Sequence, residues 1–377
     1  MTENMTKIIS IFEQISDPRK GVITYPIIEI LFLTVIGVMV GYAKWIDIEE
    51  FGEAALEYLR EYLPFESGVP RYVTIARVIA AIDPKEMNGL LEDLSRTLRV
   101  KSKNDHIAID GKHIGNNLYT VSAYLTEESL TLKQSEGYTQ GHELANIKEV
   151  ISKLCLKGCT TTIDSIACNR EVVELIAKKK GHAIIGLKGN QKYLEAQVRN
   201  LFENKRESKF KDIRHETCSV TEKGHGRIEI RNLTTILDLE LIPELRTWKY
   251  VRAVAEVESI RMVKKRNSSE YKESKEYRYY ILTSEFTAEE AFKFIRNHWR
   301  IENNLHWVLD VTMHEDSTKI LLKNAVVNMA SIRRMILGIL KPVKPEKKSM
   351  RRYQRSLAIN KKHLDQAISA FINIAAI

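Results

Sequence analysis

Apolar residues in the first 100 positions recur at intervals of three and four, which is the spacing of amphipathic helices. Asp-Pro pairs at 17–18 and 83–84 interrupt the pattern, because the residue before a proline disfavours helical geometry. The helices predicted from this spacing lie before 17, over 26–43, over 45–63, and on both sides of 83–84 within 71–98. We expect this N-terminal helical segment, 1–100, to be either a helix-turn-helix module that binds DNA or an accessory domain. The pattern favours neither alternative.

From residue 106 the apolar positions form short alternating runs, which predict strands. Three such runs come first, with turns expected at Gly111 and at 127–128. Helical and strand patterns then alternate as far as residue 204. The order of three strands followed by alternating helices and strands predicts an α/β fold with a mixed sheet flanked by helices. That order is the layout of an RNase H-like fold.

A β-rich stretch, 207–285, interrupts this alternation before helical spacing returns. We interpret it as an insertion that divides the α/β domain into a first part, 101–206, and a last part, 286–340. Within the insertion, the hydrophilic residues 264–276 predict an exposed loop between two strands. The remainder, 341–377, forms a basic C-terminal segment.

The net charge of +9 is concentrated near the C-terminus. Residues 341–362 hold nine Lys or Arg and one Glu. Such a cluster suits the neutralisation of DNA phosphates, whereas binding to RNA or to a membrane surface fits less well. A solvated basic tail without a partner is the alternative.

The four cysteines have no zinc-knuckle spacing, which indicates reduced thiols in a cytosolic protein. The first residues lack the basic-then-apolar order of a signal peptide. The most apolar run, 30–43, is shorter than the roughly 20 residues that a membrane-crossing helix requires. The sequence therefore predicts a cytoplasmic protein with no membrane partner.

Two aspartates end apolar strands in matching contexts, because Asp110 follows IAI and Asp164 follows TTTI. If the two strands are neighbours, both carboxylates emerge at the edge of the sheet where α/β proteins bind ligands. Carboxylates at that edge can hold Mg²⁺, which prefers oxygen ligands. Taken alone, an aspartate in this context is more often a turn or helix-cap residue, and it is the matching pair that favours a functional role.

A third carboxylate, Glu302, lies within HWRIENNLHWVLD (298–310), at the margin of an apolar helical stripe. A carboxylate beside a buried stripe is disfavoured unless a partner compensates its charge. A metal ion would provide that partner, and so would a salt bridge to His298 one turn earlier. The sequence leaves both open.

Several motifs of unusual composition occur in order between about residues 17 and 340. They are DPR (17–19), YAKWIDIEEFG (42–52), IAIDGK (107–112), VSAY (121–124), TIDSIACN (162–169), LKGNQ (187–191), GHGRIEIR (224–231) and RNHWRIENNLHWVLDV (296–311). In these motifs the chain resembles bacterial insertion-sequence transposases of the DDE type, in the group that includes the H-repeat-associated proteins. Those transposases belong to the RNase H-like, or retroviral-integrase, superfamily.

The resemblance implies that Asp110, Asp164 and Glu302 are the catalytic acidic triad and the metal ligands. The implied cofactor is Mg²⁺, with Mn²⁺ as a substitute, bound as two ions about 3.5–4 Å apart. These ions would activate water to cut the transposon end and then activate the freed 3′-hydroxyl to attack target DNA. The implied partners are the terminal inverted repeats and the target DNA, bound by a homodimer associated with the bacterial nucleoid.

Other basic, amide-bearing or aromatic residues in or near the motifs and the basic segment are candidates for contact with DNA. They are Lys112, Lys188, Gln191, Arg227, His298, Trp299, Arg300, Asn303, His306, Arg351 and Arg352. Trp299 or Trp307 would stack on an unpaired base near the cut, and packing in the core is the alternative for each.

The chain departs from the family pattern at two places. GKHIGNN follows Asp110 where relatives usually carry Thr and a basic residue after GK. Ile295, His298 and Leu309 occupy positions at which broader relatives have Tyr, Arg and Lys. Both departures concern contacts with the DNA ends and leave the triad intact.

Two other functions fit parts of the sequence. On a regular helix His298, Glu302 and His306 share one face, as in a zinc hydrolase, but the tighter His-Glu-x2-His spacing is absent. The other alternative is a catalytically silent DNA-binding protein derived from a transposase. The intact triad disfavours it, because unused catalytic residues are free to drift.

Overall fold

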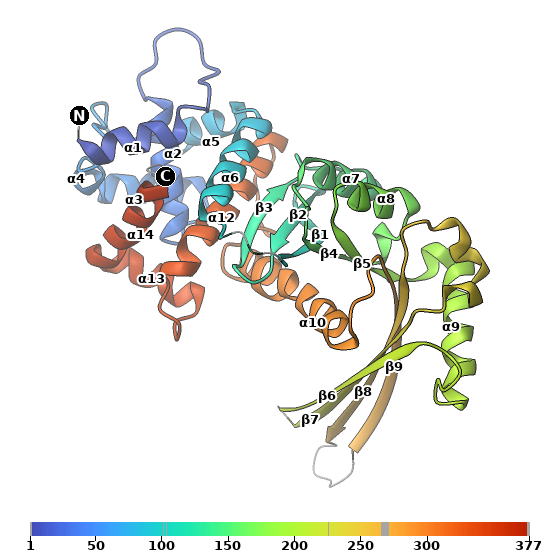
Figure 1. Cartoon of the computed structure of the whole chain (residues 1–377). Helices are drawn as coiled ribbons and strands as arrows, with labels where there is room; N and C mark the ends of the chain where they lie inside the picture. Colours follow the sequence, from blue (N-terminus) through green and yellow to red (C-terminus); the bar gives the residue numbers. More distant parts are fainter. Residues whose placement is uncertain (1, 101, 103, 225, 265–270, 375–377) are drawn as a thin grey trace. The chain divides into compact units, whose positions relative to one another are not determined.

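The computed structural model describes residues 2–374, with gaps at 101, 103, 225 and 265–270 (Figure 1). The chain forms two compact units. The first unit comprises residues 1–101, 111–146 and 301–377, and the second comprises 102–110 and 147–300. The chain therefore passes between the units directly after Asp110 and directly after Arg300.

The first unit is mainly helical. Its elements are α1 (Glu3–Phe12), α2 (Ile27–Met39), α3 (Trp45–Ala54), α4 (Leu56–Leu59), α5 (Tyr72–Ala81), α6 (Pro84–Leu98), β2 (Leu118–Leu125), β3 (Leu130–Gln134), the π-helix Glu302–His306, α11 (Trp307–Val311), α12 (Lys323–Val343), α13 (Met350–Ile359) and α14 (Lys361–Asn373). Strands β2 and β3 pair antiparallel. Of the described helices, none has the length and apolarity needed to span a bilayer.

The structure contains helices over most of the N-terminal stretches for which helical spacing predicted them. The predicted break between two helices at Asp83 and Pro84 is present. The Asp83 carboxylate accepts a hydrogen bond from the backbone N–H of Lys85 and so caps the start of α6. The run predicted as one helix over 45–63 is instead two helices, separated at Ala55.

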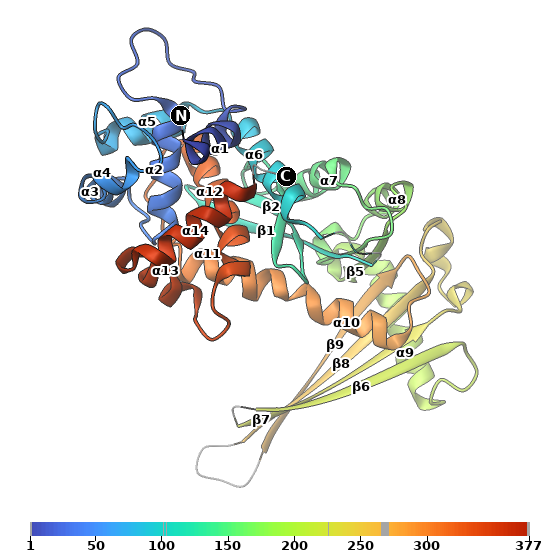
Figure 2. The ribbon, with the colours of Figure 1, turned by 60° about the vertical axis from the view of Figure 1, so that its left-hand side comes forward.

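Helix α12 forms the centre of the first unit and is buried from Ala325 to Leu340. It packs against α2, α5, α6, α14 and β3 (Figures 1 and 2). Helices α1 and α14 also meet, with the rings of Phe12 and Phe371 5.9 Å apart. Residues from opposite ends of the sequence therefore share one core.

The second unit contains a mixed sheet. In spatial order its strands are β1 (His106–Gly115, of which residues 106–110 belong to this unit), β4 (Thr160–Ile163), β5 (His182–Leu187), β9 (Tyr271–Leu282), β8 (Ala253–Lys264), β7 (Arg227–Ile236) and β6 (His215–Gly224). Strands β1, β4 and β5 are parallel and the others are antiparallel. The predicted mixed sheet is confirmed.

Helices accompany this sheet in the predicted alternation. They are α7 (Glu143–Lys153, which begins in the first unit), α8 (Arg170–Lys178), α9 (Lys192–Glu207) and α10 (Ala288–His298), with short 3₁₀ turns at Ser165–Ala167, Gly189–Gln191, Leu239–Leu241 and Pro243–Thr247. Helix α10 packs on β4, β5, β6 and β7, and buries Phe292 and Ile295 against the sheet. The four strands β6 to β9 form the long ribbon seen in Figure 2.

The turn predicted at Gly111 is wrong, because β1 continues through this residue to Gly115. The chain instead reverses at Asn116 and Asn117, whose φ angles of 50° and 56° lie in the left-handed region that asparagine tolerates. Gly111 has a different role. A Cβ atom at this position would meet the Glu143 carboxylate, so a larger residue here would require the flexible Glu143 side chain to move.

The loop predicted over 264–276 is partly strand. Residues 271–276 belong to β9 and pair with Ser259–Lys264 of β8, whereas 265–270 lie outside the described residues. This part of β9 is exposed on both faces. Its sequence therefore lacks the alternation of apolar and polar residues that identifies a half-buried strand.

Candidate catalytic carboxylates and their surroundings

Asp110 and Asp164 occupy equivalent positions on neighbouring strands. Strands β1 and β4 are parallel, and Ile109 is paired with Ile163. Each aspartate is the next residue in the chain, and adjacent strands lie about 4.8 Å apart. The expected neighbourhood of the two strands is confirmed. Asp164 directly follows the end of β4, as predicted, whereas Asp110 does not end its strand, because β1 continues to Gly115.

Asp164 is exposed and also caps a short turn. One of its carboxylate oxygens accepts a hydrogen bond from the backbone N–H of Ile166 at 3.1 Å. The helix-cap role that the sequence allowed is therefore present. It fixes the carboxylate at the strand end, which is also what a metal ligand requires.

A buried threonine links β4 to two histidines. The Thr162 hydroxyl lies 2.7 Å from Nε2 of His106 on β1 and 3.0 Å from Nδ1 of His298 on α10. Burial, together with the charges of His298, Arg300 and Lys293, lowers the pKa of His106 to about 3. His106 is therefore neutral at pH 7. No pattern in the sequence marks His106, which simply begins an apolar strand.

We expect Thr162→Val to lower the free energy of unfolding by about 1–3 kcal/mol, because two imidazole nitrogens lose this buried hydroxyl. Thr162→Ser keeps the hydroxyl and serves as the control. Urea denaturation followed by circular dichroism measures the difference. Equal stability of the Val and Ser variants would show that the hydroxyl does not hold His298 in place.

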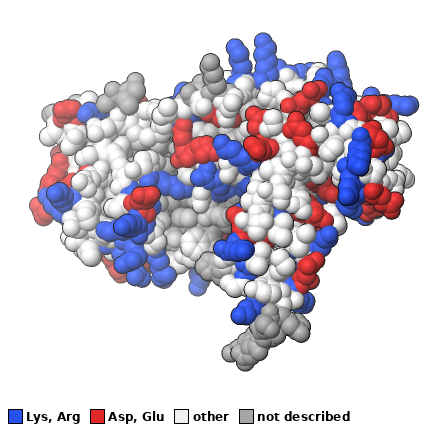
Figure 3. Space-filling view, turned by 60° about the horizontal axis from the view of Figure 1, so that its bottom comes forward, with Lys and Arg blue, Asp and Glu red and all other residues white. Residues whose placement is uncertain are grey.

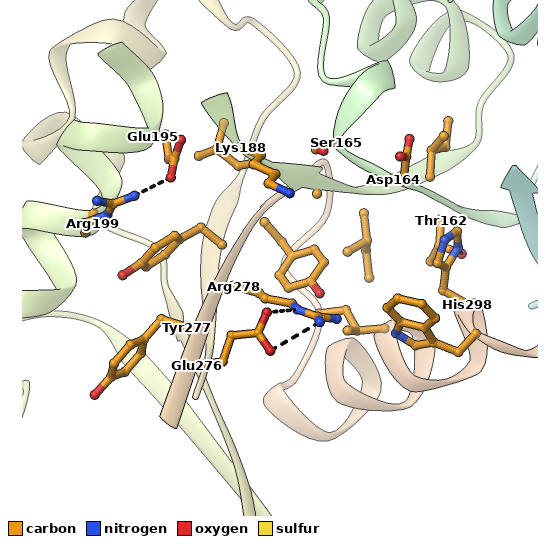
Figure 4. A pocket seen from close by; sticks show the side chains of 18 of the residues that line it. Thr162, Asp164, Ser165, Lys188, Glu195, Arg199, Glu276, Tyr277, Arg278 and His298 are labelled. Atoms are coloured by element: carbon orange, nitrogen blue, oxygen red, sulfur yellow. Dashed lines mark hydrogen bonds and ion pairs between the residues drawn. The ribbon is translucent and has the colours of Figure 1, made fainter. Parts of the chain in front are cut away.

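A cavity of about 600 Å³ opens beside Asp164 in the second unit. Two ion pairs line it, Glu195 with Arg199 and Glu276 with Arg278 (Figure 4). Its other polar and aromatic lining residues are Thr162, Ser165, Lys188, Glu203, Tyr277, Tyr279, Tyr280, His298 and Trp299. Sequence reasoning identified Lys188, His298 and Trp299. It missed the contributions of β9 and α9, whose residues reach this cavity only through the folded sheet.

Trp299 is 43% exposed, so it is not a core residue. The guanidinium of Arg278 lies 5.3 Å from the centre of its ring, within the range of a cation–π contact. Arg278 is in turn held by Glu276, at 2.9 Å from Nε to the carboxylate. The ring is thus presented at the cavity with a cation beside it.

Glu302 begins a π-helix that continues to His306. The sequence predicted a regular α-helix here, but the structure has a turn at Trp299 and then the π-helix before α11. The Glu302 carboxylate lies 3.3 Å from Nδ1 of His306. Burial lowers the pKa of the His306 imidazole despite this contact with Glu302. π-Helical turns are rare and frequently occur at functional sites.

The π-helix also bears on the zinc alternative. That alternative required one regular helical face for His298, Glu302 and His306, and the turn at Trp299 and the π-helix interrupt this face. His298 contacts Thr162, whereas Glu302 contacts His306.

The other predicted DNA contacts differ in exposure. Lys112 is buried and its ammonium pairs with Asp310. The Gln191 side chain donates to the backbone carbonyl of Cys168 at 2.9 Å. The predicted residues that are exposed are Lys188, Arg227, Trp299, Asn303, Arg351 and Arg352, and those that are half-buried are His298 and Arg300. Contact of these residues with DNA stays a prediction.

Acidic and basic side chains are interspersed on the face drawn in Figure 3. The basic residues of α13 are among the exposed ones, since Arg351, Arg352 and Arg355 all face solvent.

Comparison with known proteins identifies the family. Residues 101–339 match the model described as "Transposase DDE domain", and residues 9–94 match the model described as "DDE_Tnp_1-associated". The "Putative protein YbfL" of Escherichia coli (strain K12) is 34% identical over 353 residues, which cover 90% of this chain and 91% of that protein. The "H repeat-associated putative transposase YhhI" of the same organism is 34% identical over 354 residues, which cover 90% of this chain and 92% of that protein.

A shorter similarity involves a protein named as inactive. Over 58 residues, 15% of this chain, the sequence is 43% identical to the "Inactive transposase YbfQ" of Escherichia coli (strain K12), with 69% of that protein covered.

The mixed α/β fold and these matches together identify a transposase-related protein. The chain belongs to the Transposase DDE domain family. Proteins of this family generally depend on divalent metal ions, for which carboxylates at strand ends are suitable ligands.

Proposed function

We propose that this protein is an active DDE transposase, which cuts DNA at transposon ends and transfers the cut strand into target DNA. The observation that carries the proposal is the register of β1 and β4, which gives Asp110 and Asp164 equivalent positions on parallel neighbours. Glu302 is the third catalytic residue. We assign the strand and helix order to an RNase H-like catalytic fold.

The covalent path of the chain supports this triad. Asp110 is the last residue of its segment in the second unit, and Glu302 is the second residue after the chain leaves that unit. Both catalytic groups thus lie at points where the chain passes from one unit to the other.

The donor atoms fit Mg²⁺, with Mn²⁺ as a substitute. Asp110, Asp164 and Glu302 offer only carboxylate oxygens, which hard divalent cations prefer. Asp110, Glu302 and His306 also carry atoms of the kinds that bind metals. When bound, two such ions would polarise the attacking oxygen and stabilise charge on the phosphate.

The protein's own residues would hold and orient the DNA around this site. Asp164 is fixed by its hydrogen bond to Ile166, and His298 is held beside β4 by Thr162. Lys188, at the cavity next to Asp164, is available to contact a phosphate. Trp299 would stack on an unpaired base near the cut, a contact that contributes about 1–3 kcal/mol per base.

Other segments would bind DNA away from the cut. We assign this role to the basic segment 341–377, through Arg351 and Arg352, and to Arg227 in the inserted β segment 207–285. Segments 101–206 and 286–340 would form the catalytic part. Helices of residues 1–100 would bind DNA or support the catalytic part. Two copies would assemble on paired inverted repeats in the bacterial nucleoid.

Cleavage of a labelled duplex that carries the sequence flanking the gene tests the proposal. We expect strand cleavage with Mg²⁺ or Mn²⁺ and none with EDTA, because the carboxylates alone cannot activate the attacking oxygen. Gel electrophoresis measures the products, and a scrambled duplex is the control. Binding of the duplex without cleavage in either metal would identify a silent DNA-binding protein instead.

A further inference from the structure

Four charged side chains form a cluster inside the first unit. The ammonium of Lys112 pairs with the Asp310 carboxylate and lies 3.6 Å from the Glu315 carboxylate. Glu315 in turn pairs with Arg334 at 2.7 Å. The side chains of Glu315 and Arg334 are fully buried, and that of Lys112 is 6% exposed. We call this set the ionic cluster.

The partners of the ionic cluster are well defined. The Arg334 guanidinium also donates to the Ser122 hydroxyl and to the carbonyl of Ala330. Lys112 donates to the carbonyl of His113 at 2.9 Å. Burial alone would raise the pKa of Glu315, but the charges of Arg334, Lys112 and Arg333 lower it below its usual value. The Glu315 carboxyl is therefore ionised at neutral pH.

Such a cluster is a poor source of stability. Removing charged groups from water costs free energy, which offsets much of their mutual attraction. Well-packed apolar residues in their place often stabilise a protein equally. What an ion pair offers instead is a defined geometry between the elements that carry it. The positions of these elements in the chain therefore indicate its role.

The cluster joins the strand after Asp110 to the helix after Glu302. Lys112 lies on β1, two residues beyond Asp110, and Asp310 lies on α11, which directly follows the π-helix. Glu315 follows α11 and is anchored to α12 through Arg334. The π-helix that begins at Glu302 is thus followed within the same unit by a segment fixed at two points.

We propose that Lys112 is a positioning residue, which holds Glu302 as a metal ligand through its ion pair with Asp310. This inference rests on the proposed function. It assigns Lys112 a role other than the DNA contact suggested by the sequence. Groups that orient metal ligands typically change metal affinity 10–100-fold when they are removed.

The test is the affinity of the full-length, DNA-free protein for Mn²⁺, measured by electron paramagnetic resonance of the unbound ion. We expect Lys112→Met to weaken binding by about 10-fold or more, while Lys112→Arg, which keeps a cation, retains most of the affinity. Asp110→Asn, which removes the negative charge of a proposed ligand, gives the reference for a damaged site.

The chain offers a closely matched control in Lys133 on β3. Its side chain is 8% exposed and pairs with Glu92, which is 29% exposed; Lys112 and Asp310 are 6% and 31% exposed. Lys133→Met therefore removes an equally buried cation from the same unit at a pair that involves neither β1 nor α11. We expect it to bind Mn²⁺ as the wild type does.

Three results would overturn the inference in distinguishable ways. If Asp110→Asn weakens Mn²⁺ binding and Lys112→Met does not, the positioning role is wrong and the metal site stands. If both Lys→Met variants weaken binding equally, the loss reflects general loosening, which thermal denaturation of each variant would also reveal. If wild type and Asp110→Asn bind alike, the proposed metal site fails as well.

Discussion

Asp110→Asn should lower the rate of DNA cleavage about 1000-fold and leave affinity for DNA nearly unchanged. The amide keeps the shape of the side chain but removes one negative charge from a metal ligand. A loss of about 4 kcal/mol of transition-state stabilisation corresponds to that factor. Phosphate contacts come from basic residues, so binding should persist. Single-turnover cleavage and gel-shift titration measure the two quantities separately.

A matched control for this change is Glu240→Gln. Glu240 is an exposed acid of the same unit, on the 3₁₀ turn Leu239–Leu241. The Glu240→Gln variant loses the same charge at a place away from the strands β1 and β4, and it should cut DNA at the wild-type rate. Cleavage by Asp110→Asn at a rate within a few-fold of this control would remove Asp110 from the catalytic triad. Loss of DNA binding in Asp110→Asn would instead indicate a damaged fold.

Arg334→Met should lower the free energy of unfolding by about 3–5 kcal/mol, the range for breaking a buried ion pair. The change leaves the fully buried Glu315 carboxylate without its 2.7 Å partner. Urea denaturation, followed by circular dichroism, measures the loss. The double variant Arg334→Met with Glu315→Met should recover much of it, because no carboxylate then stays buried without its arginine.

An exposed pair provides the comparison. Lys361 and Glu61 are 2.6 Å apart, but their side chains are 59% and 51% exposed. Lys361→Met should therefore lower the free energy of unfolding far less than Arg334→Met does. If Arg334→Met lowers the free energy of unfolding by no more than Lys361→Met does, the pair of Arg334 and Glu315 does not experience the low dielectric constant that its burial implies.

The hydrophobic pattern was sufficient to predict the parallel strands that carry Asp110 and Asp164. The runs IAI and TTTI are short and buried, and TTTI is followed by the cap residue Asp164, so the pattern identifies both as strands. Their pairing followed from the alternation of strands with helices. The positions of the two aspartates were predictable because they depend on local sequence and on this simple topology.

Other features depended on contacts that the sequence does not reveal. The first half of β9 is polar on both faces, so no pattern distinguishes it from a loop. The π-helix at Glu302 has no signature in composition. Arg334 lies in the middle of a buried helix, and only the folded chain brings Glu315 to it. Long-range partners of this kind decide where a buried charge is tolerated.

The meeting of α1 with α14 has a consequence for how the protein is made. Phe12 and Phe371, which pack together, leave the ribosome roughly 20–70 s apart at 5–20 residues per second. During that time α1 lacks its contact with α14, and until α12 is made α2 lacks its contact with that helix. The apolar surface left open must be shielded by chaperones or transient collapse. The π-helix with Glu302 belongs to the same late-closing unit. A nascent chain that stalls before α14 would therefore present an unfinished core, and only chains whose synthesis has passed that helix would complete this unit.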